Sequence, residues 1–199
     1  MIKLKVIGLC GGSGVGKGYV GKMFAALGFS VIDTDAVYHR ILSEGGDCVN
    51  ELRREFGDGI MQGASLDRKE LAKIVFSDAE KHRVLNTITH KHILSDVRAT
   101  IRELSRKGER AVIVDAPMLF ESGFDKECDI TLGVVADENI RIDRIVNRDG
   151  ITRERALARI SNQLSTSQIV EKCDFVITNN GSDEELRSEF GQFINKFLN

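Results

Sequence analysis

Residues 4–18 read LKVIGLCGGSGVGKG, and this stretch decides the fold of the chain. The apolar run over residues 4–9 predicts a buried parallel strand. A loop with four glycines follows directly and ends in Lys17. Apolar residues then return at helical spacing, at Val20, Met23, Phe24 and Leu27. A strand, a glycine-rich loop, a lysine and a helix in this order predict a phosphate-binding loop, or P-loop.

The predicted loop has the chemistry that a nucleotide phosphate requires. Glycines let the backbone turn tightly and aim its N–H groups inward, and the helix N-terminus adds about half a positive charge. Lys17 would reach the terminal phosphates as a point charge. The motif usually ends in Ser or Thr, whose hydroxyl binds Mg²⁺, but Gly18 stands there. We expect ATP to contact Gly11, Gly12, Ser13, Gly14, Val15, Gly16, Lys17 and Gly18. A glycine-rich turn without a phosphate role is the alternative.

The composition is that of one globular domain, because 199 residues with 42% hydrophobic content can bury a sizeable core. A net charge of −2 gives no bulk positive field, so we expect no nucleic acid partner. No apolar run is long enough to span a membrane, and no signal peptide precedes the first strand. The four cysteines form no CxxC pair and predict buried, reduced thiols of a cytoplasmic protein.

Short apolar strands alternate with helices along the chain. We expect further strands at residues 29–32, 111–114, 130–135 and 175–178. Residues 36–109 show no convincing strand and predict helices at 36–42, 49–56, 68–76 and 80–106, whereas later helices are expected at 138–147, 152–163 and the C-terminus. This pattern predicts an α/β fold with a parallel five-stranded sheet flanked by helices. The single domain 1–199 would comprise a core (1–35, 110–137 and 166–199), a helical substrate-binding part (36–109) and a helical lid (138–165).

Three candidate residues follow strands and should share one edge of the sheet. Gly11, Asp33 and Asp115 each come directly after a predicted strand, where ligands of such sheets collect. A carboxylate at Asp33 could accept a proton from a substrate hydroxyl or hold Mg²⁺ through water, and Asp35 lies on the same face. Helix capping is the alternative role for both. Asp115 stands where such folds place a metal-binding aspartate, and a simple turn residue is its alternative.

Arginines dominate the predicted lid. Arg141, Arg144 and Arg148 are spaced three and four apart and therefore lie along one helix face. A guanidinium is planar and always charged, which suits phosphate, and a lid that closes over ATP would exclude water. A solvated surface charge is the alternative for any one of these arginines. His90 and His92 lack the Glu/His spacing of a zinc site, so we expect no zinc there.

In order and spacing, these motifs resemble the dephospho-CoA kinase family over nearly the whole chain. The matching blocks are Gly8-Leu9-x-Gly11-Gly12-x-Gly14-x-Gly16-Lys17, Val31-Ile32-Asp33-Thr34-Asp35 with Arg40, Phe56-Gly57, Leu66-Asp67-Arg68, Phe76, Leu85-Asn86-x-Ile88-x-His90, Val114-Asp115-x-Pro117-x-Leu119-Phe120-Glu121, Arg148-Asp149, Arg159-Ile160-x-x-Gln163 and Asp174-x-Val176-Ile177-x-Asn179-x-Gly181.

The resemblance implies a kinase that phosphorylates the 3'-hydroxyl of dephospho-CoA with ATP and Mg²⁺, the last step of coenzyme A biosynthesis. It implies that Asp33, Lys17 and Arg148 are catalytic, and that Asp33 and Asp115 hold the metal through water. ATP would also contact Arg144, Arg148, Asn179 and Gly181. The acceptor substrate would contact Asp33, Asp35, Arg40, His90 and Leu119. The chain departs from the family at Gly18, usually Ser or Thr, and at Lys91, commonly Pro.

Two other functions remain as alternatives. Shikimate kinase also carries Asp-Thr-Asp at this place, but it would have a glycine-rich stretch after the third strand, where this chain has Ala116–Glu121. A nucleotide-binding module without catalysis is the non-enzyme alternative, suggested by Gly18. We expect no obligate protein partner for the enzyme.

Overall fold

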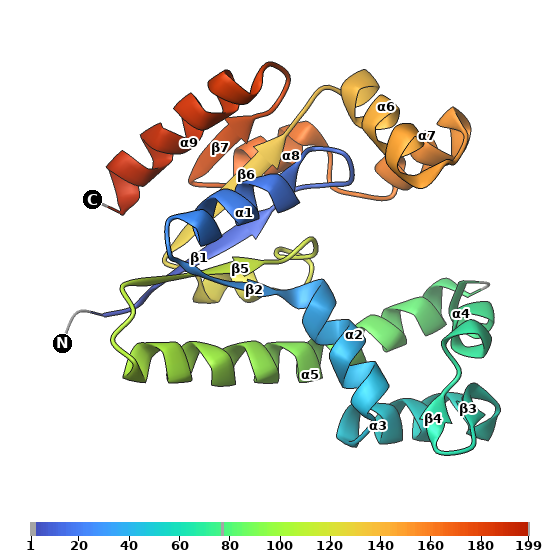
Figure 1. Cartoon of the computed structure of the whole chain (residues 1–199). Coiled ribbons are helices and arrows are strands. Elements are labelled where there is room, and N and C mark those ends of the chain that lie inside the picture. Colours follow the sequence, from blue (N-terminus) through green and yellow to red (C-terminus); the bar gives the residue numbers. More distant parts are fainter. Residues whose placement is uncertain (1–2, 77, 199) are drawn as a thin grey trace. The chain divides into compact units, whose positions relative to one another are not determined.

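The computed structural model describes residues 3–76 and 78–198 of the chain. They form two compact units, which are described separately. Unit 1 comprises Met1–Ile32 and Leu104–Asn199, and unit 2 comprises Asp33–Glu103. Figure 1 shows the course of the chain and the labels of its elements.

A five-stranded sheet forms the centre of unit 1, in the order β2-β5-β1-β6-β7. Its strands are β1 (Lys5–Cys10), β2 (Ser30–Asp33), β5 (Ala111–Asp115), β6 (Ile130–Val135) and β7 (Phe175–Thr178). β1 pairs in parallel with β5 and β6, and β6 pairs in parallel with β7. The predicted α/β fold with a five-stranded sheet is therefore confirmed, and the P-loop follows its central strand.

Helices cover both faces of the sheet, which explains why its inner strands are continuous apolar runs. Helices α1 (Lys17–Ala26) and α9 (Asp183–Phe197) lie side by side on one face, where Phe24 and Phe190 join the main core. Leu132 and Val134 of β6 point into the same core. Gly133 between them faces the other side, toward Ile169 of α8 (Thr166–Lys172).

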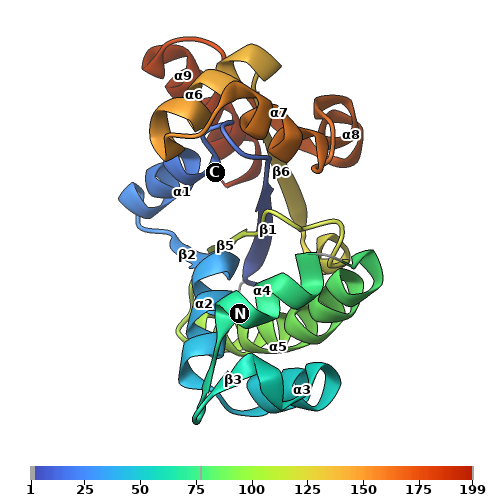
Figure 2. The same ribbon diagram turned by 90° about the vertical axis from the view of Figure 1, so that its right-hand side faces the viewer.

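Helices α6 (Glu138–Asp149) and α7 (Arg153–Ser161) form a hairpin after β6 (Figure 2). The hairpin has a small apolar core of its own, made by Ile142, Ile145, Ala156 and Ile160. The turn between the helices begins at Gly150, whose left-handed φ of 65° ends α6. This hairpin is the segment that the sequence predicted as a lid.

Unit 2 is mainly helical. Its helices are α2 (Thr34–Glu44), α3 (Asp47–Phe56), α4 (Arg68–Phe76) and α5 (Ala79–Arg106), of which α5 continues past the unit boundary. Leu52 and Ile60 are fully buried in its core. The expectation of no strand in this region was wrong, because β3 (Met61–Gln62) and β4 (Ser65–Leu66) form a short antiparallel hairpin. Two-residue strands leave no alternation for a sequence pattern to detect.

Smaller elements differ from the sequence prediction in bounds or existence. Helix α8 was not predicted because it is short, although Ser165 and Gln168 form a capping box at its start. Single 3₁₀ turns occur at Asp58–Ile60 and Phe124–Glu127. All four cysteines are free thiols, but only Cys10 and Cys48 are buried. In the described residues, no helix combines the length and apolarity that a membrane crossing needs.

Candidate functional site

The P-loop connects β1 to α1 through backbone conformations that favour glycine. Gly14 and Gly16 have φ angles of 80° and 91°, in the left-handed region that side chains disfavour. Gly16 is the N-cap of α1 and has no side chain that could cap the amides of its first turn. An uncapped helix N-terminus at the end of a glycine loop is a ready anion site.

Arg141 of α6 and Gln163, which follows α7, hold Ser13 at the tip of the loop. Ser13 N donates to Gln163 Oε1 (2.9 Å), and Gln163 Nε2 donates to Ser13 Oγ (3.2 Å). Arg141 Nε donates to Ser13 O (2.9 Å), and Arg141 Nη2 donates to Gln163 Oε1 (3.1 Å). Ser13 N, O and Oγ therefore all have partners outside the loop, so the loop is held in one shape.

Glycine at position 12 makes this close approach of the two side chains feasible. A Cβ on Gly12 would lie 2.5 Å from Arg141 Nη2 and 2.7 Å from Gln163 Oε1. Arg141 is buried, with 4% of its surface exposed. Burial lowers the pKa of Arg141, but a guanidinium remains charged in proteins. A positive charge thus lies buried against the P-loop.

Arg144 and Asn179 hold two loop carbonyls. Asn179 Nδ2 donates to Val15 O (2.8 Å), and Arg144 Nη1 donates to Gly14 O (3.3 Å). Arg144 Nη2 also donates to Asn179 Oδ1 (3.4 Å). The structure therefore brings these two predicted ATP ligands to the P-loop itself. Gly181, the other ATP ligand predicted after β7, lies against the Glu185 side chain.

Lys17 and Asp115 form an ion pair at the ends of β1 and β5. Lys17 Nζ donates to Asp115 Oδ1, and the two side chains are 14% and 11% exposed. The parallel register places Leu9 opposite Asp115, so Asp115 lies at the same end of the sheet as the P-loop. The pair brings together two residues that the sequence assigned to phosphate and metal binding.

Arg148 pairs with Asp149, whereas Arg141 and Arg144 of the same helix contact the P-loop. Its Nε and Nη2 donate to the two carboxylate oxygens of Asp149, at 2.7 and 3.0 Å. Arg159 also donates to Asp149 Oδ2 (2.5 Å), and these hydrogen bonds lower the pKa of the Asp149 carboxyl. The guanidinium fork of Arg148 is therefore already paired, and its predicted contact with ATP stays a prediction.

Asp33 caps helix α2 with one carboxylate oxygen. Asp33 Oδ1 accepts from Asp35 N (2.9 Å) and Ala36 N (3.1 Å), as the capping alternative predicted. Asp33 and Asp35 are both exposed. The cap fixes the orientation of the Asp33 carboxylate and leaves its predicted role as a base untested.

The other predicted acceptor contacts are spread over both units. Within unit 2, Arg40 Nη2 donates to Asp96 Oδ1 (2.7 Å), and burial lowers the pKa of His90. In unit 1, Leu119 is fully buried, and a Cβ on Gly8 would lie 2.9 Å from its side chain. The roles of these three residues toward the acceptor remain predictions.

Sequence reasoning did not assign a role to Gln163, and it treated Arg141 only as one arginine of a lid face. Both turn out to hold Ser13. Gln163 belongs to one block of the family resemblance, but its contact with a residue 150 positions earlier has no local pattern. A glycine at position 12 was the one sequence feature that could have indicated a close neighbour.

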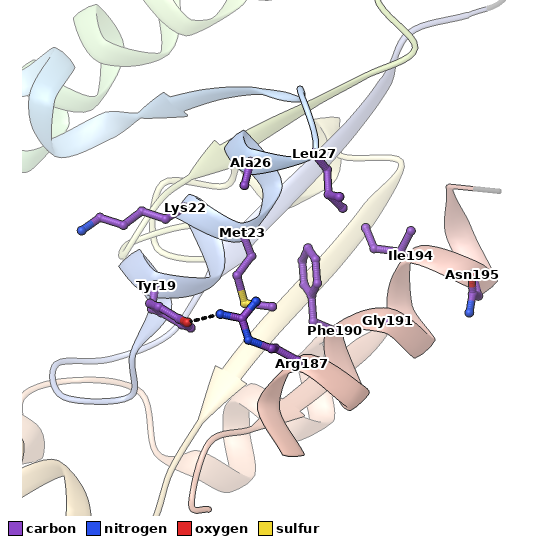
Figure 3. Close-up of a pocket in the computed structure, with 10 residues that line it drawn as sticks. All are labelled: Tyr19, Lys22, Met23, Ala26, Leu27, Arg187, Phe190, Gly191, Ile194 and Asn195. Carbon is purple, nitrogen blue, oxygen red and sulfur yellow. Dashed lines mark hydrogen bonds between the residues drawn. The ribbon is translucent and has the colours of Figure 1, made fainter. Parts of the chain in front are cut away.

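One pocket of unit 1 lies away from the P-loop residues. It sits between α1 and α9, with Met23, Phe190 and Ile194 on its apolar side (Figure 3). Arg187 Nη2 donates to Tyr19 Oη (2.8 Å) at its edge. None of the predicted site residues lines this pocket, so it is not the predicted nucleotide site.

Comparisons with known proteins find one family whose members are similar to this chain over nearly its whole length. The family described as Dephospho-CoA kinase matches residues 5–185. The dephospho-CoA kinase of Carboxydothermus hydrogenoformans is 36% identical over 198 residues, which cover 99% of this chain and 96% of that relative. Among solved structures, TT1252 from Thermus thermophilus has a TM-score of 0.82 at 31% identity, covering 98% of both chains.

A second solved structure carries a functional name. The dephospho-CoA kinase from Campylobacter jejuni has a TM-score of 0.70 at 25% identity, covering 96% of both chains. These matches span nearly the whole chain, and they favour this family over the shikimate-kinase-like alternative. The chain belongs to the dephospho-CoA kinase family.

Proposed function

We propose that this chain transfers the γ-phosphoryl group of ATP to the 3'-hydroxyl of dephospho-CoA and releases coenzyme A and ADP. The family membership supports this reaction. The observation that carries the proposal is the P-loop, whose tip and carbonyls are held by Arg141, Gln163, Arg144 and Asn179. A preorganised cradle of this kind stabilises a transferring phosphoryl group mainly by position and charge.

Lys17 is the proposed contact of the terminal phosphates of ATP. Its ammonium group contacts Asp115, and an incoming ATP would offer it the more highly charged β- and γ-phosphate oxygens. Moving to the phosphates would release the Asp115 carboxylate. The loop amides and the N-terminus of α1 would bind the remaining phosphate oxygens.

Mg²⁺ fits this site as a cation held mainly by the substrate. Among the described residues, no group of three or more His, Cys, Asp or Glu side chains could enclose a metal. Asp115 already holds a cation in a largely buried place, and Mg²⁺ commonly uses one or two carboxylates, waters and phosphates. We propose that Asp115 and Asp33 bind it through water. When bound, the ion would neutralise charge on the β- and γ-phosphates.

Asp33 is the proposed general base. Its Oδ1 is engaged by the α2 cap, so we assign the proton of the acceptor hydroxyl to Oδ2. Asp35, Arg40, His90 and Leu119 are the proposed contacts of dephospho-CoA. Gly181 is proposed to contact the adenine of ATP.

Arg148 is the proposed lid residue at the transferring phosphoryl group. Its planar fork would exchange the carboxylate of Asp149 for phosphate oxygens. The α6–α7 hairpin would then act as a lid, with Arg144 beside the nucleotide. We further propose a cytoplasmic location, because all four cysteines are free thiols, and no obligate protein partner.

One assay tests the reaction directly. Purified protein is mixed with Mg²⁺, ATP and dephospho-CoA, and the products are identified by mass spectrometry. We expect coenzyme A and ADP in equal amounts, and no shikimate phosphate when shikimate replaces dephospho-CoA. ATP binding by calorimetry without any coenzyme A would instead support the non-catalytic nucleotide-binding module.

A further inference from the structure

Two free thiols lie side by side at the base of the P-loop. The Sγ atoms of Cys10 and Cys173 are 3.4 Å apart, although the residues are 163 positions apart in the sequence. Cys10 is the last residue of β1 and directly precedes Gly11. Cys173 ends α8 and comes two residues before β7. The pair therefore joins the strand that enters the loop to the connection that enters the last strand.

The fold holds Cys173 in place and leaves room for its side chain against strand β6. Gly133 of β6 pairs with Cys10, and a Cβ on Gly133 would lie 3.0 Å from the Cys173 sulfur. The next residue, Asp174, makes three hydrogen bonds with Thr131: its N–H donates to Thr131 Oγ1 (3.0 Å), and its Oδ2 accepts from Thr131 N (2.8 Å) and Thr131 Oγ1 (2.7 Å). A larger residue at 133 would displace the Cys173 side chain.

The two thiols differ in exposure and in acidity. Cys10 is 1% exposed, whereas Cys173 is partly exposed to solvent. A hydrogen bond from the Cys10 thiol favours the thiolate of Cys173, which lowers the pKa of Cys173 and raises the pKa of Cys10. Since thiolates are the reactive form, Cys173 is the thiol that an oxidant in solution meets first.

We propose that Cys10 and Cys173 are a reversible oxidation site, at which hydrogen peroxide closes a disulfide beneath the P-loop. The Cys173 thiolate attacks one peroxide oxygen, the O–O bond breaks, and the hydroxide that leaves takes up a proton to become water. The Cys10 sulfur then attacks the resulting sulfenic sulfur, and a second water leaves with the Cys10 proton. Two thiols and one peroxide become one disulfide and two waters.

The disulfide would disturb the loop that it adjoins. An S–S bond is about 2.05 Å long, so the sulfurs must approach from their present 3.4 Å. Gly11, the neighbour of Cys10, packs closely against strand β6, because a Cβ there would lie 2.6 Å from Val134 O. A shift of Cys10 must therefore move the start of the loop. The expected loss of activity rests on the proposed kinase function, whereas formation of the disulfide does not.

The test oxidises the full-length protein with hydrogen peroxide. Intact-mass spectrometry should show the loss of two hydrogen atoms, and digestion without reductant should yield a peptide that links Cys10 to Cys173. The kcat/KM for coenzyme A formation should fall at least about tenfold, because small displacements at reacting groups are costly. Dithiothreitol should restore both the mass and the activity.

Two variants serve as a matched pair. Cys173→Ala should resist the loss of activity and form no linked peptide, and Cys128→Ala, which removes another partly exposed thiol, should behave as the wild type. Wild-type protein without the linked peptide overturns the site, whatever the variants do. A linked protein that keeps its full rate overturns the effect on the loop. An inactive reduced enzyme that still forms the link refutes the kinase proposal alone.

Discussion

The ammonium group of Lys17 donates a hydrogen bond to the carboxylate of Asp115, and this contact joins the P-loop to the end of the neighbouring strand β5. Both side chains are largely buried, at 14% and 11% exposure. The ion pair therefore compensates part of the charge of each group in a poorly solvated place. In the proposed reaction, ATP would draw the Lys17 ammonium group toward its phosphates.

Removal of the lysine charge should show how much this ion pair contributes to the free energy of unfolding. Lys17→Met should lower the free energy of unfolding by about 3 kcal/mol, because it removes the ion pair from the largely buried Asp115 carboxylate. The measurement is urea unfolding without nucleotide. Lys17→Met/Asp115→Asn should recover part of the loss, since the amide carries no charge. Equal stabilities of the single and double variants would show that the remaining Asp115 charge does not cause the loss.

Asp33→Asn should reduce turnover by about 10²–10⁴-fold, because an amide cannot accept the substrate proton. ATP affinity should stay close to normal, and helix α2 should keep its cap, because asparagine also caps helices. Steady-state rates and calorimetric ATP binding are the measurements. Asp78→Asn is the matched control, since Asp78 caps α5 in the same way. If Asp33→Asn keeps more than a tenth of the rate, Asp33 is not the base.

Arg148→Lys should slow phosphoryl transfer even though the positive charge remains. Lysine has no planar fork and can make only single contacts with phosphate oxygens. The rate is measured at saturating ATP, so that weaker binding does not contribute. Arg153→Lys is the control, because Arg153 is an exposed arginine of the same hairpin, paired with Asp143. Equal rates for both variants would argue against a bidentate role of Arg148.

Gly18→Ser should lower the Mg²⁺ concentration that gives half-maximal rate. A Cβ on Gly18 would have no neighbour within 4 Å, so the protein itself has room for a serine. The added hydroxyl supplies the metal-binding oxygen that the usual motif has. Gly18→Ala separates this effect from helix propensity, which favours alanine by up to about 1 kcal/mol. If Gly18→Ala lowers the Mg²⁺ concentration for half-maximal rate as much as Gly18→Ser does, the hydroxyl has no role in metal binding.

Gln163→Leu should weaken ATP binding about tenfold, since Ser13 N and the charged Arg141 both lose their acceptor. Gln163→Glu should restore affinity, because its carboxylate accepts from both groups. The calorimetric Kd for ATP should be higher in Gln163→Leu than in Gln163→Glu. In Gln163→Leu, kcat should change less than the KM for ATP. If the two variants bind ATP equally well, Gln163 does not position the loop for the nucleotide.

The sequence predicted those features that follow from local pattern. The P-loop could be recognised because a strand, four glycines, Lys17 and a helix must follow one another in this order. The ends of the strands placed Asp115 at the P-loop edge, because parallel strands share their direction. The order and spacing of the motifs also indicated the family, and the comparisons confirmed it.

The missed features depend on contacts that no local pattern contains. Ser13 meets Gln163 across 150 residues, and Cys10 meets Cys173 across 163. The helical spacing predicted that Arg148 shares a face with Arg141 and Arg144, but its pairing with Asp149 depends on rotamers that the sequence does not specify. The β3–β4 hairpin was missed because strands of two residues show no period.

The support of Val15 by Asn179 has a consequence for the synthesis of the protein. The two residues are 164 positions apart, so a ribosome makes the P-loop long before it makes the side chain that holds it. Arg141 and Gln163 also emerge only in the last third of the chain. On the proposed function, we therefore expect a nascent chain to bind nucleotide firmly only after residue 179 has been made. Premature termination before residue 179 yields a fragment with the full motif and without its support.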